Sequence, residues 1–282
     1  MKVSGFTIIR NGEIFAYPFT EAILSILPLC DEMIVNVGKS DDDTLDIVKS
    51  IDSGKIKIFE SEWNMNLKGG LVLSVETNKA LQKCSGDWCF YIQSDEVLHE
   101  KYHDIVRKEM HDNLNKSSVE GLRFRYRHFY GSYDYYQDNY RKWYIKESRI
   151  IRNSKKIVSW GDAMDFRHND GSKIKAKDID AEIFHYGWVR PPDVMMHKRI
   201  EFEKLYEKGK SAEIKIAGFK NFDDLGNLKK FNESHPEVMK HRISVSRWDF
   251  DAKLDHQHPD WLRKILMFIQ PLTKRLKKSK VT

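Results

Sequence analysis

An acidic string directly after an apolar segment is the first group of residues in this sequence that could do chemistry. Asp95 lies in Gln93-Ser94-Asp95-Glu96, immediately after residues 88–92. Carboxylate oxygens are the hard ligands that Mg²⁺ and Mn²⁺ prefer. A divalent ion held there could bridge the phosphates of a nucleotide diphosphate and stabilise the charge of a departing phosphate group. Because acidic residues are common in loops after strands, the string alone is not specific.

Two more polar clusters follow apolar segments nearer the N-terminus. Asn11 and Glu13 come after the first such segment, and Gly38 and Asp41 come after the second. Their polar groups could hydrogen-bond to ribose hydroxyls or to the edge of a base. Aspartates 41–43 could instead simply begin the next helix, where the helix dipole favours acidic residues. Both interpretations of the aspartates stay open.

Strand and helix patterns alternate through the first 115 residues and would position these clusters. The predicted strands are residues 3–9, 33–37, 56–59 and 88–92, and the predicted helices are residues 18–27, 45–51, 71–84 and 105–115. Such alternation indicates a parallel sheet wound with helices, in which ligands bind beyond the carboxyl ends of the strands. The three polar clusters are therefore expected to meet in one crevice.

The pattern changes after residue 120. Aromatic and charged side chains crowd residues 122–144, and the stretch from 123 to 149 could form a binding groove, although two half-buried strands are the favoured interpretation. Shorter strands are predicted at residues 148–151, 157–160 and 183–188. Beyond Pro191-Pro192 the pattern predicts helices to the end of the sequence.

The charge of the chain is concentrated at one end. Of the 282 residues, 40% are hydrophobic and 32% charged, and the formal net charge is +6. Residues 261–282 contain seven Lys or Arg and no Asp or Glu, so residues 1–260 sum to about −1. A nucleic-acid-binding protein would carry its basic patch on the folded body. This distribution therefore argues against a nucleic-acid partner.

The same basic tail is informative about where in the cell the protein is located. Residues 261–272 carry apolar side chains at helical spacing, so the segment could lie on an anionic membrane surface or pack on the body of the protein. The sequence has neither a run of about 20 apolar residues nor a signal peptide at its start. The expected location is the cytoplasm, with contact to the inner face of the membrane as a further option. The three cysteines are expected to be reduced thiols.

In order and spacing, these motifs resemble the family 2 glycosyltransferases, which have the GT-A fold. The resemblance covers roughly residues 3–100 and rests on six strings: Ile9-Arg10-Asn11-Gly12-Glu13, Cys30-Asp31-Glu32, Gly38-Lys39-Ser40-Asp41-Asp42-Asp43-Thr44, Asn78-Lys79-Ala80-Leu81, Ser85-Gly86-Asp87-Trp88 and Gln93-Ser94-Asp95-Glu96. It implies an α/β fold, a Rossmann-like central sheet wound with helices plus a helical C-terminal extension. The implied parts are 1–115 for the sugar donor, 116–190 for the acceptor side and 191–282 for the extension, which could all be subdivisions of one domain.

The resemblance implies a nucleotide site. In that family the loops after the first two strands hold the nucleoside, which carries that role to Asn11, Glu13, Gly38 and Asp41. The loop after the fourth strand usually reads D-x-D, and its first aspartate helps to hold the nucleotide. Gln93 occupies that position here. Its amide can hydrogen-bond to a ribose hydroxyl but cannot supply charge to a cation.

The resemblance also implies a metal site for Mn²⁺ or Mg²⁺. Asp95 matches the last position of D-x-D, which is the metal ligand in the family. Enzymes with the GT-A fold often complete the site with a histidine far downstream, and His185 is the best candidate because it follows a short apolar strand. A neutral imidazole can ligate Mn²⁺. A histidine satisfied by hydrogen bonds near the core is an equal alternative.

A transfer that inverts the sugar needs a general base on the acceptor's side of the ring. In the family this base is an Asp or Glu after the metal loop, and residues 160–165 offer two carboxylates. Asp165 is preferred to Asp162, and Glu147 is a third option. Each of them alone could also be an ordinary surface carboxylate.

The function that the resemblance implies is a metal-dependent, inverting transfer of a sugar from a nucleotide diphosphate sugar. The acceptor would be a glycan or a lipid-linked molecule in the synthesis of a cell-surface polysaccharide or glycoconjugate. A catalytically silent protein that binds carbohydrate or nucleotide is the alternative, motivated by Gln93 in place of a carboxylate. A nicotinamide-dependent oxidoreductase ranks low, because no G-x-G-x-x-G turn follows the first strand.

Overall fold

The structure is a computed structural model that describes residues 1–137, 143–206, 222, 228–250 and 252. Strands and helices alternate through its N-terminal part. In order these are β1 Val3–Ile9, α1 Phe19–Ile26, β2 Glu32–Gly38, α2 Thr44–Lys49, β3 Ile56–Ser61, α3 Leu71–Leu81, β4 Trp88–Tyr91, β5 Glu96–Leu98 and α4 His103–Asp112.

The second part of the chain is richer in strands. In order these elements are β6 Gly121–Tyr130, β7 Ser132–Gln137, β8 Lys146–Arg152, β9 Ile157–Trp160, β10 Asp165–His168, β11 Ala176–Trp188, α5 Pro192–Tyr206, β12 Leu228–Lys230 and α7 Lys240–Val245. Of the predicted strands, β1 and β9 have the predicted limits. The short strands β5, β10 and β12 were not predicted, because each contains charged residues and, unlike β9, shows no apolar run.

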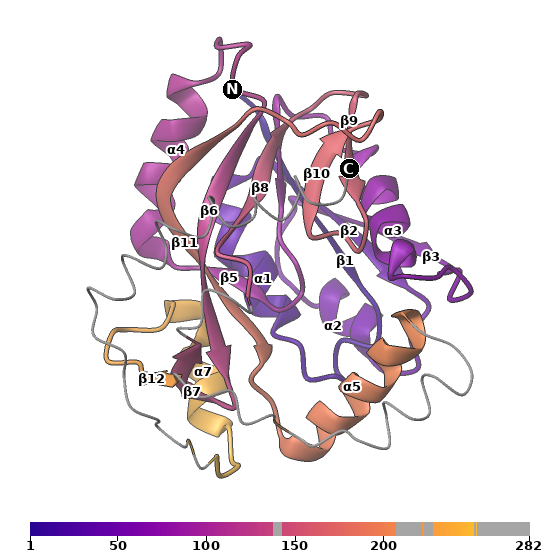
Figure 1. The fold of residues 1–282 in the computed structure, drawn as a ribbon, viewed down its shortest axis with the longest axis vertical. Helices are drawn as coiled ribbons and strands as arrows, with labels where there is room; N and C mark the ends of the chain where they lie inside the picture. Colours follow the sequence, from indigo (N-terminus) through magenta and orange to yellow (C-terminus); the bar gives the residue numbers. More distant parts are fainter. Residues whose placement is uncertain (138–142, 207–221, 223–227, 251, 253–282) are drawn as a thin grey trace, which may run out of the picture.

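One sheet joins both parts of the chain (Figure 1). Its main path runs β12-β7-β6-β8-β4-β1-β2-β3, and β11 and β5 pair off this path. Strands β1 to β4 are parallel to one another, whereas β8 lies antiparallel to both β4 and β6. The predicted parallel sheet of the first part is therefore confirmed, and the same sheet continues past residue 116.

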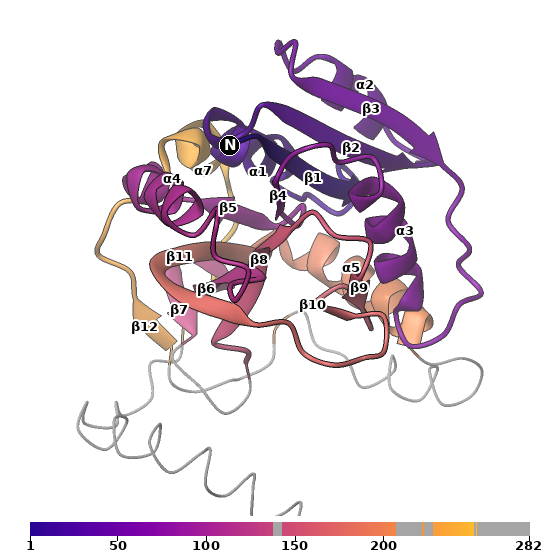
Figure 2. The same cartoon turned by 90° about the horizontal axis from the view of Figure 1, so that it is seen from above.

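Helices cover both faces of the central strands. On one face of β1, Val3 and Ile9 belong to a core cluster that also contains Ile23 of α1. On the other face, Phe6 packs in a separate cluster with Ala80 of α3. Figure 2 shows α3 and α4 on opposite sides of the sheet. Because both faces are covered, all seven residues of β1 are buried, which explains why its sequence is mostly apolar and has no charged residue.

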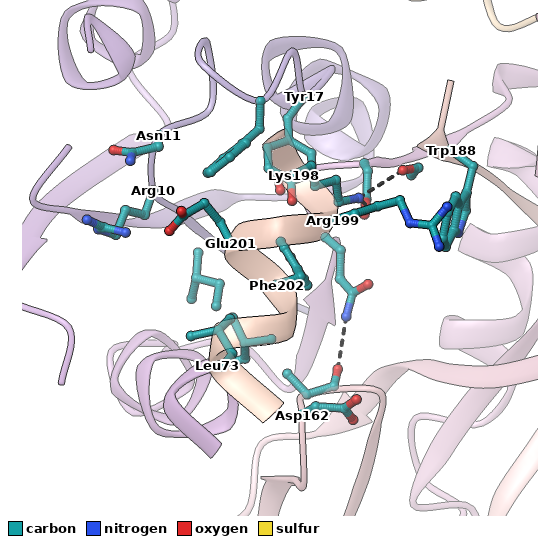
Figure 3. Close-up of a pocket in the computed structure, with 18 of the residues that line it drawn as sticks. Arg10, Asn11, Tyr17, Leu73, Asp162, Trp188, Lys198, Arg199, Glu201 and Phe202 are labelled. Atoms are coloured by element: carbon teal, nitrogen blue, oxygen red, sulfur yellow. Dashed lines mark hydrogen bonds and ion pairs between the residues drawn. The ribbon is translucent and has the colours of Figure 1, made fainter. Parts of the chain in front are cut away.

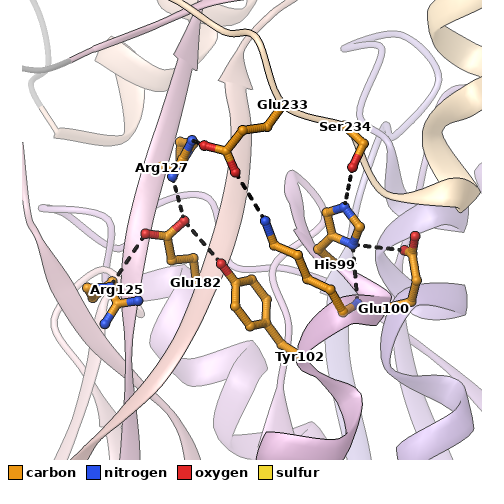
Figure 4. A network of polar contacts seen from close by, with 9 residues as sticks. His99, Glu100, Tyr102, Arg125, Arg127, Glu182, Glu233 and Ser234 are labelled. Carbon is orange, nitrogen blue, oxygen red and sulfur yellow. Dashed lines mark hydrogen bonds and ion pairs between the residues drawn. The ribbon is translucent and has the colours of Figure 1, made fainter.

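The expectation that the chain is helical beyond Pro191-Pro192 is confirmed for α5 and α7 but is wrong for β12. Strand β12 pairs antiparallel with β7 and forms an edge of the sheet. The residues that follow β12 are held by ion pairs, because Glu233 contacts both Arg127 of β6 and Lys101, and Arg127 also contacts Glu182 of β11 (Figure 4). Backbone pairing and these charges fix the segment, and neither leaves a helical period in the sequence.

Other expectations concern the ends of the chain and its thiols. The amphipathic segment 261–272 and the basic tail lie outside the described residues. Within the part of the chain that the structure covers, no helix is both long and apolar enough to cross a membrane. Cys30, Cys84 and Cys89 are all buried and free, in agreement with the expectation of reduced thiols.

Candidate active site

The ends of three neighbouring strands open on one cavity of about 620 Å³. Asn11 follows β1, Asp41 follows β2, and Gln93 and Asp95 follow β4; all four line the cavity, and so does His185 of β11. Ligands of open α/β sheets bind at such a crevice. The structure therefore brings together five of the residues that the sequence singled out, from four strands.

Asn11 and Asp41 tie the ends of β1 and β2 together. The Asn11 amide donates to Asp41 Oδ2 at 3.3 Å, and the Asp41 backbone N–H donates to Asn11 Oδ1 at 2.9 Å. Asn11 has a φ of 52°, in the left-handed region that asparagine tolerates better than most residues. The side chain of Asp41 remains 74% exposed beside Arg10, so its carboxylate can accept hydrogen bonds from a ligand.

Glu13 and Gly38 do not line the cavity. The side chain of Glu13 is exposed, and its backbone N–H donates to Asp42 Oδ2 at 3.0 Å. At Gly38, a Cβ would lie 2.5 Å from the indole nitrogen of Trp63, which does line the cavity. Gly38 therefore contributes indirectly, because its missing side chain lets the indole pack against the end of β2.

A buried lysine and a buried histidine lie beside Asp95. Its Oδ2 lies 3.5 Å from Nζ of Lys198 and 3.7 Å from Nε2 of His185. Burial alone would raise the pKa of Asp95, but the electrostatic effects of His185, Lys198 and Arg190 bring it below its ordinary value. Burial and the neighbouring Arg190 lower the pKa of Lys198 to about 7. When Lys198 is protonated, the positive charges of Lys198 and Arg190 together exceed the single negative charge of Asp95.

Hydrogen bonds fix the tautomer of His185. His128 Nε2 lies 2.8 Å from the Tyr144 carbonyl and must donate to it, so His128 Nδ1 is free to accept from His185 Nδ1 at 3.1 Å. Burial lowers the pKa of both imidazoles, which favours their neutral forms. The lone pair of His185 Nε2 consequently faces Asp95. The lone pair of His185 Nε2 and the carboxylate of Asp95 repel each other, so a cation between or beside them is favourable. The ammonium of Lys198 is such a cation.

The residues present do not fit the expected metal site well. Asp95 and His185 offer two ligands, but the ammonium of Lys198 already lies beside the same carboxylate oxygen. The described residues include no group of three or more His, Cys, Asp or Glu side chains that could hold a metal ion. The amide of Gln93 donates to the Ala163 carbonyl at 3.0 Å. A divalent ion would therefore have to displace Lys198.

A buried ion pair supports the loop after β4. Arg149 of β8 donates from Nε and Nη2 to the two oxygens of Glu96, each at 2.8 Å, and neither side chain is exposed. Glu96 also accepts from the Tyr126 hydroxyl at 2.7 Å and from the Gln93 backbone at 3.1 Å. This network holds the loop that presents Asp95.

The turn between β9 and β10 brings one of the two predicted carboxylates to the cavity. Asp162 lines it and accepts a hydrogen bond from the Tyr206 hydroxyl at 2.9 Å. Asp165, the preferred base, is not among the lining residues; it begins β10, opposite Trp160 of β9. Glu147 is also outside the lining, where burial raises its pKa to about 7.

Helix α5 forms a wall of the cavity that the sequence prediction missed, because it treated everything after residue 190 as an extension. Figure 3 shows Lys198, Arg199, Glu201 and Phe202 along this helix, between Asn11 on one side and Trp188 on the other. A signal was present in the sequence. Met195, Lys198, Phe202 and Leu205 recur at helical spacing, and a lysine within an apolar stripe is unusual enough to mark a site.

Aromatic side chains line another part of the cavity. The rings of Trp143 and Trp188 meet edge to face, with centroids 5.5 Å apart, and the guanidinium of Arg199 lies 5.8 Å from the Trp188 ring. Of the stretch from 123 to 149, only Trp143 and Tyr144 are among the described residues that line the cavity. Most of that stretch forms β6, β7 and β8, which agrees with the favoured interpretation of half-buried strands.

The central strands run β3-β2-β1-β4, with a loop containing Asp95 directly after β4. This is the order of a Rossmann-like sheet wound with helices, the fold that the resemblance implied. No protein-family model matches the chain, and no curated protein matches it.

Several solved structures are similar to the chain. S. aureus TarS matches at 15% identity, over 77% of this chain and 42% of that chain, with a TM-score of 0.42. TarS 1-349 in complex with UDP-GlcNAc matches at 15% identity, over 77% and 70%, with a TM-score of 0.40. Glucosyl-3-phosphoglycerate synthase from Mycobacterium tuberculosis in complex with Mn²⁺, UDP and phosphoglyceric acid matches at 24% identity, over 46% and 43%, with a TM-score of 0.31. The chain thus spans less than half of the first of these, and the likeness concerns the fold alone.

Proposed function

We propose that this protein transfers a sugar from a nucleotide diphosphate sugar to a hydroxyl group of an acceptor. The observation that carries the proposal is the convergence of three strand ends on one cavity with a separate carboxylate, Asp162, in its wall. A glycosyl transfer needs one part of the site to bind the nucleotide, one to stabilise the leaving diphosphate and one to activate the acceptor hydroxyl.

The donor would lie along the strand ends. Asn11 and Asp41 would hold the ribose or the base, because both combine acceptor oxygens with an open position on the cavity wall. The diphosphate would then point toward Asp95 and Lys198, where positive charge exceeds negative charge. In this orientation the sugar would lie toward the α5 side of the cavity.

The reaction is a displacement at the anomeric carbon. The acceptor oxygen forms a bond to that carbon while the bond from the carbon to the diphosphate oxygen breaks, and the nucleoside diphosphate leaves with the electron pair. Asp162 would take the proton of the acceptor hydroxyl as general base. Attack from the side opposite the leaving group inverts the configuration of the sugar. Asp165, which does not line the cavity, remains the base predicted from the sequence, and the two can be separated by mutation.

The acceptor is proposed to be a glycan or a lipid-linked sugar of a cell-surface polymer or glycoconjugate. Trp143 and Trp188 offer aromatic faces on which sugar rings stack, and Arg199 could hold an anionic group. Location in the cytoplasm and contact with a membrane through the basic tail belong to the same proposal. That tail lies outside the described residues.

A thermal-shift screen of nucleoside diphosphates and nucleotide sugars, with EDTA and with Mn²⁺, tests the proposal. A ligand that binds only the native state raises the melting temperature. We expect one nucleotide class to give a shift, and the matching nucleotide sugar to be hydrolysed slowly or transferred. Absence of any shift would contradict the proposal.

The alternative, a catalytically silent binding protein, is favoured by Gln93 and predicts a different result. Its amide is engaged with the Ala163 carbonyl rather than offering charge to the site. A silent protein would show a shift with a nucleotide or a glycan but release no nucleoside diphosphate from any nucleotide sugar. Detectable release that Asp162→Asn lowers would exclude it.

A further inference from the structure

The inner end of the cavity holds two basic side chains and one carboxylate. Lys198 lines the cavity and is 13% exposed, whereas Arg190 lies behind it and is buried. Asp95 is the carboxylate that acts on both of them. One positive charge is therefore left in excess when Lys198 is protonated. Buried charge without a partner is costly, so the arrangement favours an anion at this place.

The two cations are held together by one backbone carbonyl. Lys198 Nζ donates to the Gly187 oxygen at 2.8 Å, and Arg190 Nη2 donates to the same oxygen at 2.9 Å. Arg190 also donates to the Phe15 carbonyl, and its Nε is buried with no partner among the described residues. Both cations are thus fixed before any ligand binds, which is the condition for an effective electrostatic site.

The surroundings of Lys198 strengthen its charge toward a ligand. The rings of Tyr17 and Phe202 lie 5.0 Å and 5.1 Å from Nζ, so aromatic side chains replace water around the ammonium. Electrostatic attraction is stronger in such a medium than in water. Lys198 projects into the cavity from α5, on the wall that faces the loop after β4.

The net charge of the group formed by Lys198, Arg190 and Asp95 equals that of a divalent ion bound to a single carboxylate. A divalent ion bound to one carboxylate has a net charge of +1. When Lys198 is protonated, Lys198, Arg190 and Asp95 together give the same net charge of +1 without an ion. The diphosphate of a donor would therefore meet as much positive charge from this chain alone as a single-carboxylate metal site provides.

We propose that the ammonium of Lys198, supported by Arg190, binds the diphosphate of the donor in place of a divalent ion. The leaving nucleoside diphosphate then departs with its charge held by Lys198, and neither binding nor transfer depends on metal. This inference rests on the proposed function, because it names how the same site meets the diphosphate. It corrects the metal dependence that the sequence resemblance implied, and it gives α5 a direct part in the reaction.

Calorimetric titration of UDP, GDP, ADP and CDP in EDTA, and again in Mn²⁺, tests the inference on the full chain. We expect one of them to bind in EDTA, with an affinity that Mn²⁺ changes by less than about 3-fold. Lys198→Met should weaken that binding by about 10- to 100-fold, the scale of one charge-assisted hydrogen bond. Lys177→Met, which removes a surface lysine paired with Glu109, is the matched control and should change nothing.

Asp95→Asn gives a second test with the opposite sign. Removing the carboxylate removes the negative charge that offsets Lys198, so at a pH low enough to keep Lys198 protonated, binding of the nucleotide in EDTA should be retained or tightened. If Asp95 instead held a metal ion, the same substitution would abolish binding in Mn²⁺. The two variants together keep the inference testable even if Lys198→Met lowers the yield of folded protein.

The outcomes separate this inference from the proposed function. Binding that occurs only with Mn²⁺, is lost in Asp95→Asn and is unchanged in Lys198→Met would overturn the inference and leave the proposed function standing. Binding in EDTA that Lys198→Met does not weaken would overturn it as well. Failure of every nucleotide to bind in either buffer would overturn both.

Discussion

Arg149 and Glu96 form a doubly hydrogen-bonded ion pair beneath the cavity, with two contacts of 2.8 Å and no exposure of either side chain. Arg149 belongs to β8, and Glu96 begins β5 directly after the loop that presents Asp95. The pair therefore connects the antiparallel part of the sheet to the site formed at the ends of its parallel strands.

Removing the arginine should destabilise the protein strongly. Arg149→Met leaves the Glu96 carboxylate buried without its cation, which costs about 3–5 kcal/mol. Urea denaturation monitored by fluorescence measures the free energy of unfolding. Arg123→Met is the control, because Arg123 forms an ion pair with Asp178 at the surface, and such pairs contribute less than about 1 kcal/mol. Equal losses in the two variants would contradict this account of the buried pair.

Gly187 is the place where the backbone must come closest to the charged cluster. A Cβ there would lie 2.5 Å from His185 Cε1 and 2.8 Å from Asp95 Oδ2. Gly187→Ala should therefore displace these side chains, lower the free energy of unfolding by about 1–3 kcal/mol and weaken nucleotide binding. Gly54→Ala is the matched control, because nothing lies within 4 Å of a Cβ at that position. Titration and denaturation of both variants would show whether the effect is specific to Gly187.

Glu32 should make stability depend on pH in the acid range. Burial raises its pKa, but hydrogen bonds from Lys57, Ser4 and Ser85 outweigh burial and lower the pKa to about 2. Because the folded-state pKa lies below the unfolded value of about 4.5, the carboxylate stabilises the folded state above pH 4.5. That contribution is lost as the pH falls from there toward 2.

The comparison of wild type with Glu32→Gln isolates this effect. The difference in the free energy of unfolding between them should be constant from pH 7 to 5 and should shrink between pH 4.5 and 3. Denaturation curves at each pH measure it. A difference that stays the same down to pH 3 would show that the Glu32 carboxylate is not the titrating group.

The strand ends could be predicted from the sequence because each one leaves a local signal. The sequence of Val3–Ile9 predicts a buried strand, and the residues after it predict a polar turn. Because strands alternate with helices, such turns are expected to lie at one edge of a parallel sheet. Asn11, Asp41 and Asp95 were found in this way. Their meeting in one cavity follows from the parallel order of β1, β2 and β4.

The partners of Asp95 could not be predicted by the same reasoning. Lys198 lies 103 positions further along the chain, and its contact with Asp95 depends on how α5 packs across the cavity. A local pattern specifies that a helix forms and which face is apolar, but not the element against which that face packs. The placement of Asp162 in the cavity and of Asp165 outside it likewise depends on the turn at Gly161 and Ala163, where φ is 63° and 64°.

Asp162 and Asp165 can be told apart by their effects on catalysis. If Asp162 is the general base, Asp162→Asn should lower the release of nucleoside diphosphate by about 10²- to 10⁴-fold while nucleotide affinity stays within about 3-fold. Asp165→Asn is the control from the same turn and should lower release by less than about 3-fold, because Asp165 does not line the cavity. The substrate would be the nucleotide sugar that raises the melting temperature most, with water as acceptor. The reverse pattern, a large loss in Asp165→Asn alone, would return the role of base to the residue preferred from the sequence and would require the β9–β10 turn to rearrange when the donor binds.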